Sequence, residues 1–252
     1  MILVAKTYWA GMPFWFRRPP EGARVVSLAL RTDDARQLRA DYWSPLGSTP
    51  RVGVVVIHPR VDFTHHYTVP RLVAAGFGVL AANSRHVNND TACEHEELVL
   101  DVAACVKWLR RKAGVERVVL LGNCGGGSMV AYFQAQAALP PDMRLERSPG
   151  GTPTRFASAE MTPADGLVLV AAHRGQGHVL LRSIDAAVVD EADPFRSDPA
   201  LDVYDPRNGF REPPAPSSYA PDFVARVRDA QRERVRRIDE RARALLADHA
   251  RA

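Results

Sequence analysis

Runs of apolar residues alternate with amphipathic segments along the first two thirds of the chain. The run RVGVVVIH at 51–58 is continuous and β-branched, which is typical of a strand buried on both faces of a parallel sheet. Four further runs have the length and composition of strands. The strands that we predict are 24–31, 51–58, 77–85, 116–123 and 164–173.

Helical periodicity fills the intervals between these runs. In 94–113, Leu98, Val102, Cys105 and Leu109 recur at spacings of three and four, and Gly114 stands where a helix C-cap is expected. Two other segments, 65–76 and 125–139, also fit helices. Alternating strands and helices predict a three-layer α/β sandwich around a mostly parallel sheet.

The pattern changes toward the C-terminus. Residues 140–163 are rich in Pro and Gly and predict a surface excursion, and after residue 183 the chain becomes acidic and Pro-rich. Residues 219–251 predict one long Arg-rich helix, and no strand is expected beyond 183. We therefore divide the chain into a core, 1–183, and a lid-like or interaction segment, 184–252.

Composition narrows the functional classes. The 252 residues are 46% hydrophobic, enough for a full core, and 33 Lys and Arg stand against 29 Asp and Glu. The C-terminal arginines are interleaved with acids, which suits a solvated helix better than a nucleic-acid surface. The three cysteines, Cys93, Cys105 and Cys124, are an odd number without paired spacing, so they suggest neither a disulfide framework nor a zinc site. With no secretory or membrane-spanning pattern, we expect a soluble cytoplasmic protein without metal or organic cofactor.

The stretch VVLLGNCGGGSMVAY, residues 118–132, carries the candidate chemistry. A nucleophile between a strand and a helix needs a sharp turn and very small neighbours, and Gly122 and Gly126 flank Cys124 at this spacing. A helix N-terminus favours the thiolate, the reactive form of cysteine. The alternative is that Cys124 is a small residue in a glycine-rich turn whose amides bind phosphate.

Here the sequence resembles the α/β-hydrolase superfamily, whose elbow is GxSxG, over residues 24–180. Here Cys124 stands in place of the serine, and within the superfamily this elbow is most similar to that of the dienelactone hydrolases. The resemblance implies an oxyanion hole made by the amide of Gly125 and an amide of the loop 58–63, for which Arg60 or Val61 is the candidate. It also implies an acid and a histidine after later strands, and these two members are missing from the pattern.

The base is therefore the least determined part of the site. His173, at the end of the last predicted strand, is our candidate, although it could equally be a hydrogen-bonded loop histidine. His58 could contact substrate or brace its loop. Arg85 and His86 follow a strand at the same edge and could line the cleft, or the loop could simply make a turn before the helix.

We expect a hydrolase, or an acyl transferase, that acts on an ester, lactone or thioester through an acyl-cysteine. The alternative is a non-catalytic binding or assembly subunit, such as one half of a split enzyme. The expected partners are a small-molecule acyl substrate and either a second copy or a second chain that completes the fold.

Overall fold

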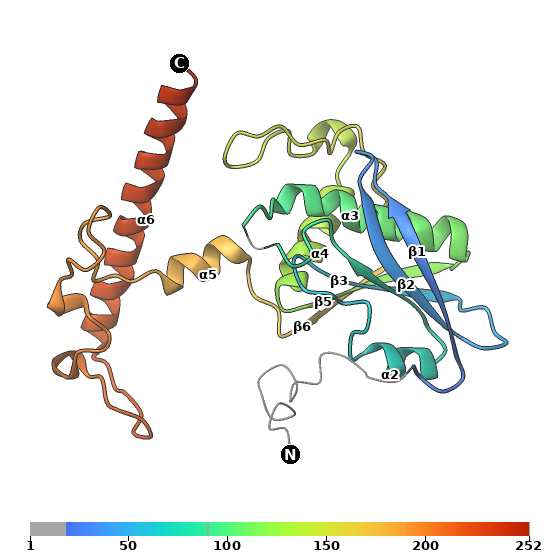
Figure 1. Ribbon diagram of the computed structural model, residues 1–252, viewed down its shortest axis with the longest axis horizontal. Helices are drawn as coiled ribbons and strands as arrows, with labels where there is room; N and C mark the ends of the chain where they lie inside the picture. The colour runs from blue at the N-terminus through green and yellow to red at the C-terminus, as the bar shows by residue number, and fades with distance from the viewer. Residues whose placement is uncertain (1–18, 90, 252) are drawn as a thin grey trace. The chain divides into compact units, whose positions relative to one another are not determined.

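In the computed structural model, which describes residues 19–89 and 91–251, one mixed sheet organises the first part of the chain (Figure 1). Its strands run in the order β1-β2-β4-β3-β5-β6. β1 and β2 are antiparallel, and the other four are parallel to one another. The predicted, mostly parallel α/β sheet is therefore confirmed. The strands are β1 (Ala23–Arg31), β2 (Gln37–Pro45), β3 (Val52–His58), β4 (Gly78–Asn83), β5 (Arg117–Asn123) and β6 (Gly166–Val170).

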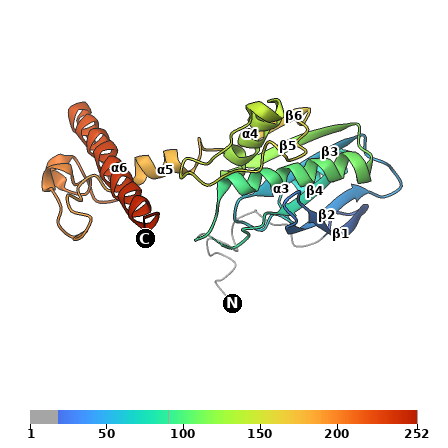
Figure 2. The same ribbon diagram turned by 90° about the horizontal axis from the view of Figure 1, so that it is seen from above.

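Helices cover both faces of this sheet. α3 (His95–Trp108) and α4 (Gly125–Ala137) pack on one face, and α2 (Val69–Ala74) packs on the other (Figures 1 and 2). Val55 and Ile57 of β3 belong to the first core, whereas Val54 and Val56 belong to the second. β3 is therefore buried on both faces, which explains the continuous apolar run in its sequence.

α3 continues into a π-helical turn, η2 (Leu109–Ala113), and the chain then reverses at Gly114. Gly114 has φ +68°, a left-handed conformation that glycine adopts without a Cβ penalty. The predicted C-cap is confirmed. A short 3-10 turn, η3 (Pro141–Met143), lies in the predicted surface excursion.

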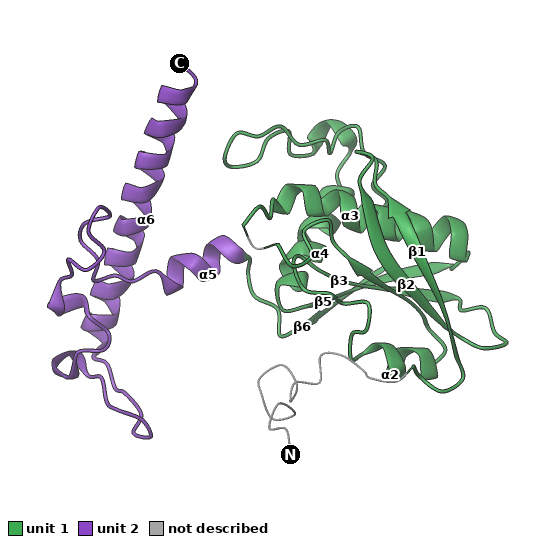
Figure 3. Ribbon diagram, viewed as in Figure 1, with its two compact units in different colours: residues 1–175 green, residues 176–252 purple. Residues whose placement is uncertain are grey.

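The chain forms two compact units, residues 1–175 and 176–252 (Figure 3). The second contains α5 (Gln176–Ser183), two 3-10 turns, η4 (Pro199–Leu201) and η5 (Pro206–Asn208), and the long helix α6 (Pro221–His249). Its core is small and centres on Ala186, Phe223 and Val227. α5, which the sequence analysis placed with the core, belongs to this second unit. None of the described helices has the length and apolar character needed to cross a membrane.

Candidate active site

Cys124 occupies a sharp turn between β5 and α4. Its backbone has φ +54° and ψ −123°, and a positive φ at a residue with a Cβ is uncommon and strained. The side chain is exposed. The turn therefore holds the thiol in the open at the carboxyl end of the parallel strands, next to the first amides of α4.

The flanking glycines make this turn possible. A Cβ on Gly122 would lie 2.5 Å from Gly127 Cα, and a Cβ on Gly126 would lie 2.6 Å from the carbonyl oxygen of Ile57. Both approaches are to backbone atoms, which cannot move aside as the tip of a side chain can. The spacing of glycines around Cys124 is thus a packing requirement of the β5–α4 turn.

Two histidines converge on the residue after the thiol. The position that a Cβ on Gly125 would occupy lies 3.2 Å from His58 Nε2 and 3.5 Å from His173 Nε2. His58 ends β3 and is buried, whereas His173 follows β6 and is half-buried. The structure thus brings Cys124, Gly125, His58 and His173 together from three loops at one edge of the sheet.

His58 holds its own loop through its Nδ1 atom. That nitrogen accepts hydrogen bonds from the backbone N–H groups of Arg60, at 3.1 Å, and Val61, at 3.0 Å. We predicted that one of these two amides would face the oxyanion. In the structure both amides donate to the imidazole and brace the loop after β3 against His58.

His66, a buried histidine that we did not predict as a site residue, contacts the residue before the thiol. His66 Nε2 lies 3.3 Å from Asn123 Oδ1, and Asn123 Nδ2 donates to the carbonyl oxygen of Val170. That carbonyl also accepts the backbone N–H of Cys124 at 3.0 Å. His66 therefore connects the loop after β3 to the residue that precedes the thiol.

His66 is neutral in this setting. Burial lowers its pKa to about 4, against the smaller opposing effect of the hydrogen bond with Asn123. No local sequence signal distinguishes it from its neighbour His65, because its burial depends on packing between β3, β5 and the following loop.

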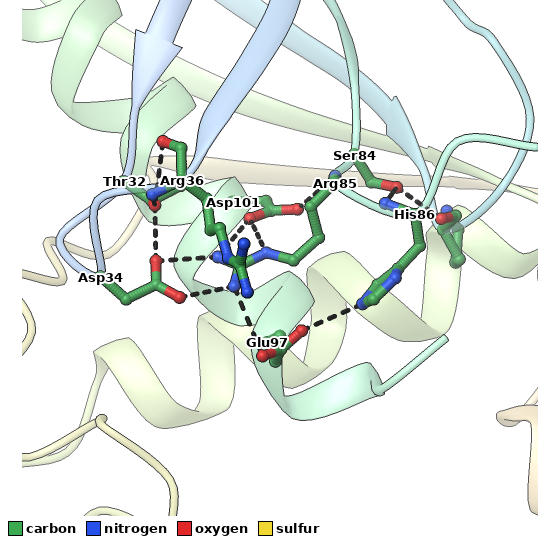
Figure 4. A network of polar contacts seen from close by, with 9 residues as sticks. Thr32, Asp34, Arg36, Ser84, Arg85, His86, Glu97 and Asp101 are labelled. Atoms are coloured by element: carbon green, nitrogen blue, oxygen red, sulfur yellow. Dashed lines mark hydrogen bonds and ion pairs between the residues drawn. The ribbon is translucent and has the colours of Figure 1, made fainter. Parts of the chain in front are cut away.

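Arg85 lies in a buried ion-pair network (Figure 4). Its guanidinium contacts Asp34 at 2.5 Å and Asp101 at 2.7 Å, and its side chain is only 5% exposed. Arg85, which we predicted to line the cleft, thus clamps the β1–β2 turn to α3. Burial alone would raise the pKa of Asp34, but hydrogen bonds from Arg85 and Thr32 outweigh it and lower that pKa.

His86, predicted with Arg85 to line the cleft, contacts Glu97 of α3, with Nε2 at 3.1 Å from the carboxylate (Figure 4). It is also close enough to His95 to influence its ionisation. Burial lowers the pKa of His95; Glu96 opposes this, and Arg60, His86 and His173 add to it. His95, at the start of α3, is therefore close to basic side chains from the loops after β3, β4 and β6.

His178 lies on α5 and His249 ends α6, so both belong to the second unit. Among residues 19–89 and 91–251, no group of three His, Cys, Asp or Glu side chains is arranged to hold a metal ion.

Comparison with known proteins gives similarity only at the level of solved structures. No protein-family model and no curated protein matches the sequence. Esterase B from Lactobacillus rhamnosis, in an inhibited form, matches with TM-score 0.47 and 16% identity over 67% of this chain and 54% of that one. Brefeldin A esterase, a bacterial homologue of human hormone-sensitive lipase, matches with TM-score 0.39 and 16% identity over 48% of this chain and 37% of its own.

An acetyl xylan esterase from Paenibacillus sp. R4 matches with TM-score 0.40 and 13% identity, over 48% of this chain and 47% of that enzyme. The matched region thus spans about a third to a half of the length of these three esterases.

Proposed function

We propose that this protein hydrolyses esters, lactones or thioesters through a covalent acyl-Cys124 intermediate, as the resemblance of its elbow to the α/β hydrolases implies. The observation that carries the proposal is the backbone of Cys124, held at φ +54° with its thiol exposed at the start of α4. Such strain persists only where the surrounding structure imposes it, and it clusters at functional sites.

The proposed reaction has two stages, acylation of Cys124 and hydrolysis of the acyl thioester. The sulfur, as thiolate, adds to the substrate carbonyl carbon, and the carbonyl oxygen becomes an oxyanion close to the backbone N–H of Gly125. Collapse of this intermediate breaks the bond to the alkoxide or thiolate leaving group and leaves an acyl thioester on Cys124. Water then adds to the thioester and releases the carboxylic acid and the thiol.

Mass spectrometry after incubation with p-nitrophenyl acetate tests the proposal. We expect one acetyl group on the peptide that contains Cys124, together with release of p-nitrophenolate, and neither in Cys124→Ala. Cys93→Ser is the matched control, because Cys93 is half-buried and lies before α3; it should react like the wild type. A folded wild-type protein that gains no acetyl group on Cys124 would contradict the proposal.

An acyl transferase would use the same steps with an acceptor other than water. Product analysis with added alcohols, amines and thiols separates it from a hydrolase, since the transferase forms the acyl-acceptor product faster than the free acid.

A second candidate is a binding or assembly subunit that pairs with a second copy or another chain. The observation that favours it is β6, which ends the sheet and exposes Leu167, Val168 and Leu169 by 41%, 44% and 52%. Iodoacetamide labelling discriminates, because this candidate predicts a Cys124 no more reactive than Cys93 at neutral pH.

A further inference from the structure

We propose that His58 and His173 act as hydrogen-bond donors to the anionic sulfur and to the oxyanion, and that neither removes the thiol proton. This inference rests on the proposed function and assigns a role to each ring in it. It departs from our own expectation that His173 is the base.

Backbone hydrogen bonds fix the tautomer of each ring. A backbone N–H can only donate, so a ring nitrogen that accepts from it carries no proton. His173 Nδ1 accepts the N–H of Gly175 at 3.2 Å, and His58 Nδ1 accepts the N–H groups of Arg60 and Val61. In each neutral imidazole the single proton is therefore on Nε2.

The two Nε2 atoms are also the ones that lie near the elbow. Both lie within 3.5 Å of the position that a Cβ on Gly125, the residue after Cys124, would occupy. Each ring thus presents an N–H, rather than a lone pair, to the space beside Cys124. Together with the first amides of α4, the two rings line this space with donors, which is what a thiolate or an oxyanion requires.

A role as base would require the other tautomer of each ring. In His173, an Nδ1–H would then point at the backbone N–H of Gly175. In His58, it would point at the backbone N–H groups of Arg60 and Val61. Each lost hydrogen bond leaves a backbone donor unsatisfied, which disfavours that tautomer most strongly where the donor is buried. His58 is buried and would lose two such bonds, so its tautomer is the more strongly fixed.

This arrangement restricts the chemistry. The thiol loses its proton to solvent before the substrate reacts, and the leaving group departs as an anion that takes a proton from water. Because no group transfers a proton to the departing atom, aryl esters and thioesters should react well, and simple alkyl esters poorly. Deacylation relies on water without a positioned base, so the acyl-enzyme should accumulate.

The pH dependence of acylation should then report one ionisation, that of the thiol. The charged and titratable groups at this edge come from several elements. They are His58 and Arg60 after β3, His86 after β4, His95 and Glu96 at the start of α3, and His173 after β6.

The decisive comparison is His173→Gln against His173→Ala, with p-nitrophenyl acetate and stopped-flow detection of p-nitrophenolate. The glutamine amide can place an N–H donor near the Nε2 position but cannot act as a base. We expect His173→Gln to acylate within about threefold of the wild type and His173→Ala to lose about 100-fold, the usual cost of an oxyanion donor. Equal losses in both variants would overturn the inference.

A control and a second measurement keep the test independent of folding. His178→Gln, on α5 in the second unit, should leave acylation unchanged, and thermal unfolding reports the stability of each variant. In the wild type alone, acylation by a series of aryl acetates should slow steeply as the leaving group becomes less acidic. A flat series would overturn the inference, because it indicates proton transfer to the leaving group.

The two proposals fail in different ways. If wild-type Cys124 is not acylated, the proposed function is wrong. If Cys124 is acylated but glutamine does not replace His173, the function stands and the donor role is wrong.

Discussion

Residue 124 combines two properties that conflict in an ordinary turn, a Cβ atom and a positive φ. The conformation costs on the order of 1–3 kcal/mol, and the packing of Gly122 and Gly126 against neighbouring backbone maintains it. The strained backbone thus lies at the one cysteine in the described residues whose side chain is exposed. This pattern suits a functional constraint better than a need for a small core residue.

We predict that Cys124→Gly is more stable than Cys124→Ala by roughly 1 kcal/mol. Glycine removes the strain, and part of this gain is offset by the greater conformational entropy of glycine in the unfolded chain. Urea unfolding at neutral pH measures the difference, and both variants lack the thiol, so they are matched in chemistry. Equal stabilities would mean that the backbone at residue 124 is not strained in solution.

How much of the site could be predicted differs from residue to residue. The elbow could be predicted, because close packing between β5 and α4 imposes glycine at fixed spacings from Cys124. The role of the 58–61 loop could not, because the amides of Arg60 and Val61 turn toward a ring whose position depends on the packed sheet. Arg85 follows β4 as the cleft residues of such sheets do, yet its partner Asp101 comes from a distant turn of α3.

At the scale of elements, the buried parallel strands were the most predictable, since apolar composition alone marks β3, β4 and β5. β2 received no prediction because Arg39, Asp41 and Ser44 interrupt its apolar pattern. Asp41 is nevertheless buried and accepts a hydrogen bond from Ser27 of β1 at 2.6 Å. A cross-strand partner that compensates a buried carboxylate cannot be read from the strand's own sequence.

The loop between β3 and α2 should make stability depend on pH through His66. Its folded pKa of about 4 lies below the ordinary value near 6.5, so the unfolded chain binds the proton first. The contribution of His66 to the free energy of unfolding is therefore fully present above pH 6.5. It falls by roughly 3 kcal/mol as the pH decreases toward 4.

Urea unfolding of the wild type and of His66→Gln between pH 7 and pH 4 checks this prediction. The variant should lose less stability than the wild type over that interval. His65→Gln is the matched control, since the adjacent His65 side chain is 51% exposed, and it should keep the wild-type slope. Identical slopes in all three proteins would show that His66 is not buried as a neutral ring.

The contact between the β1–β2 turn and α3 depends on Arg85. Arg85→Met should destabilise the protein by about 3–5 kcal/mol, because it leaves Asp34 and Asp101 as buried carboxylates without their cation. Arg51→Met is the control, since the pair Arg51–Glu116 is largely exposed and should contribute little. If Arg85→Met instead kept its stability and lost only acylation, Arg85 would be a substrate contact after all.

For the whole molecule, the division into two units is the feature that sequence patterns located least well. The predicted boundary followed the change in composition at 183, whereas the compact units meet at 175 and 176. The helix α5, residues 176–183, precedes the acidic and Pro-rich sequence, so the change in composition gave no reason to separate it from the core. Its packing against α6 assigns it to the second unit.

The edge strand β6 predicts that the protein forms a dimer. β6, with the sequence GLVLV, has no charge and no proline, the devices that commonly protect a sheet edge from pairing. Two such edges can pair antiparallel about a two-fold axis, which needs no second kind of chain. We therefore expect concentration-dependent dimerisation in sedimentation velocity, and we expect Leu169→Lys to abolish it.

Val26→Lys, on the exposed strand at the opposite edge, should leave the dimer intact. A wild-type protein that stays monomeric at all concentrations, or a dimer lost equally in both variants, would exclude pairing through β6.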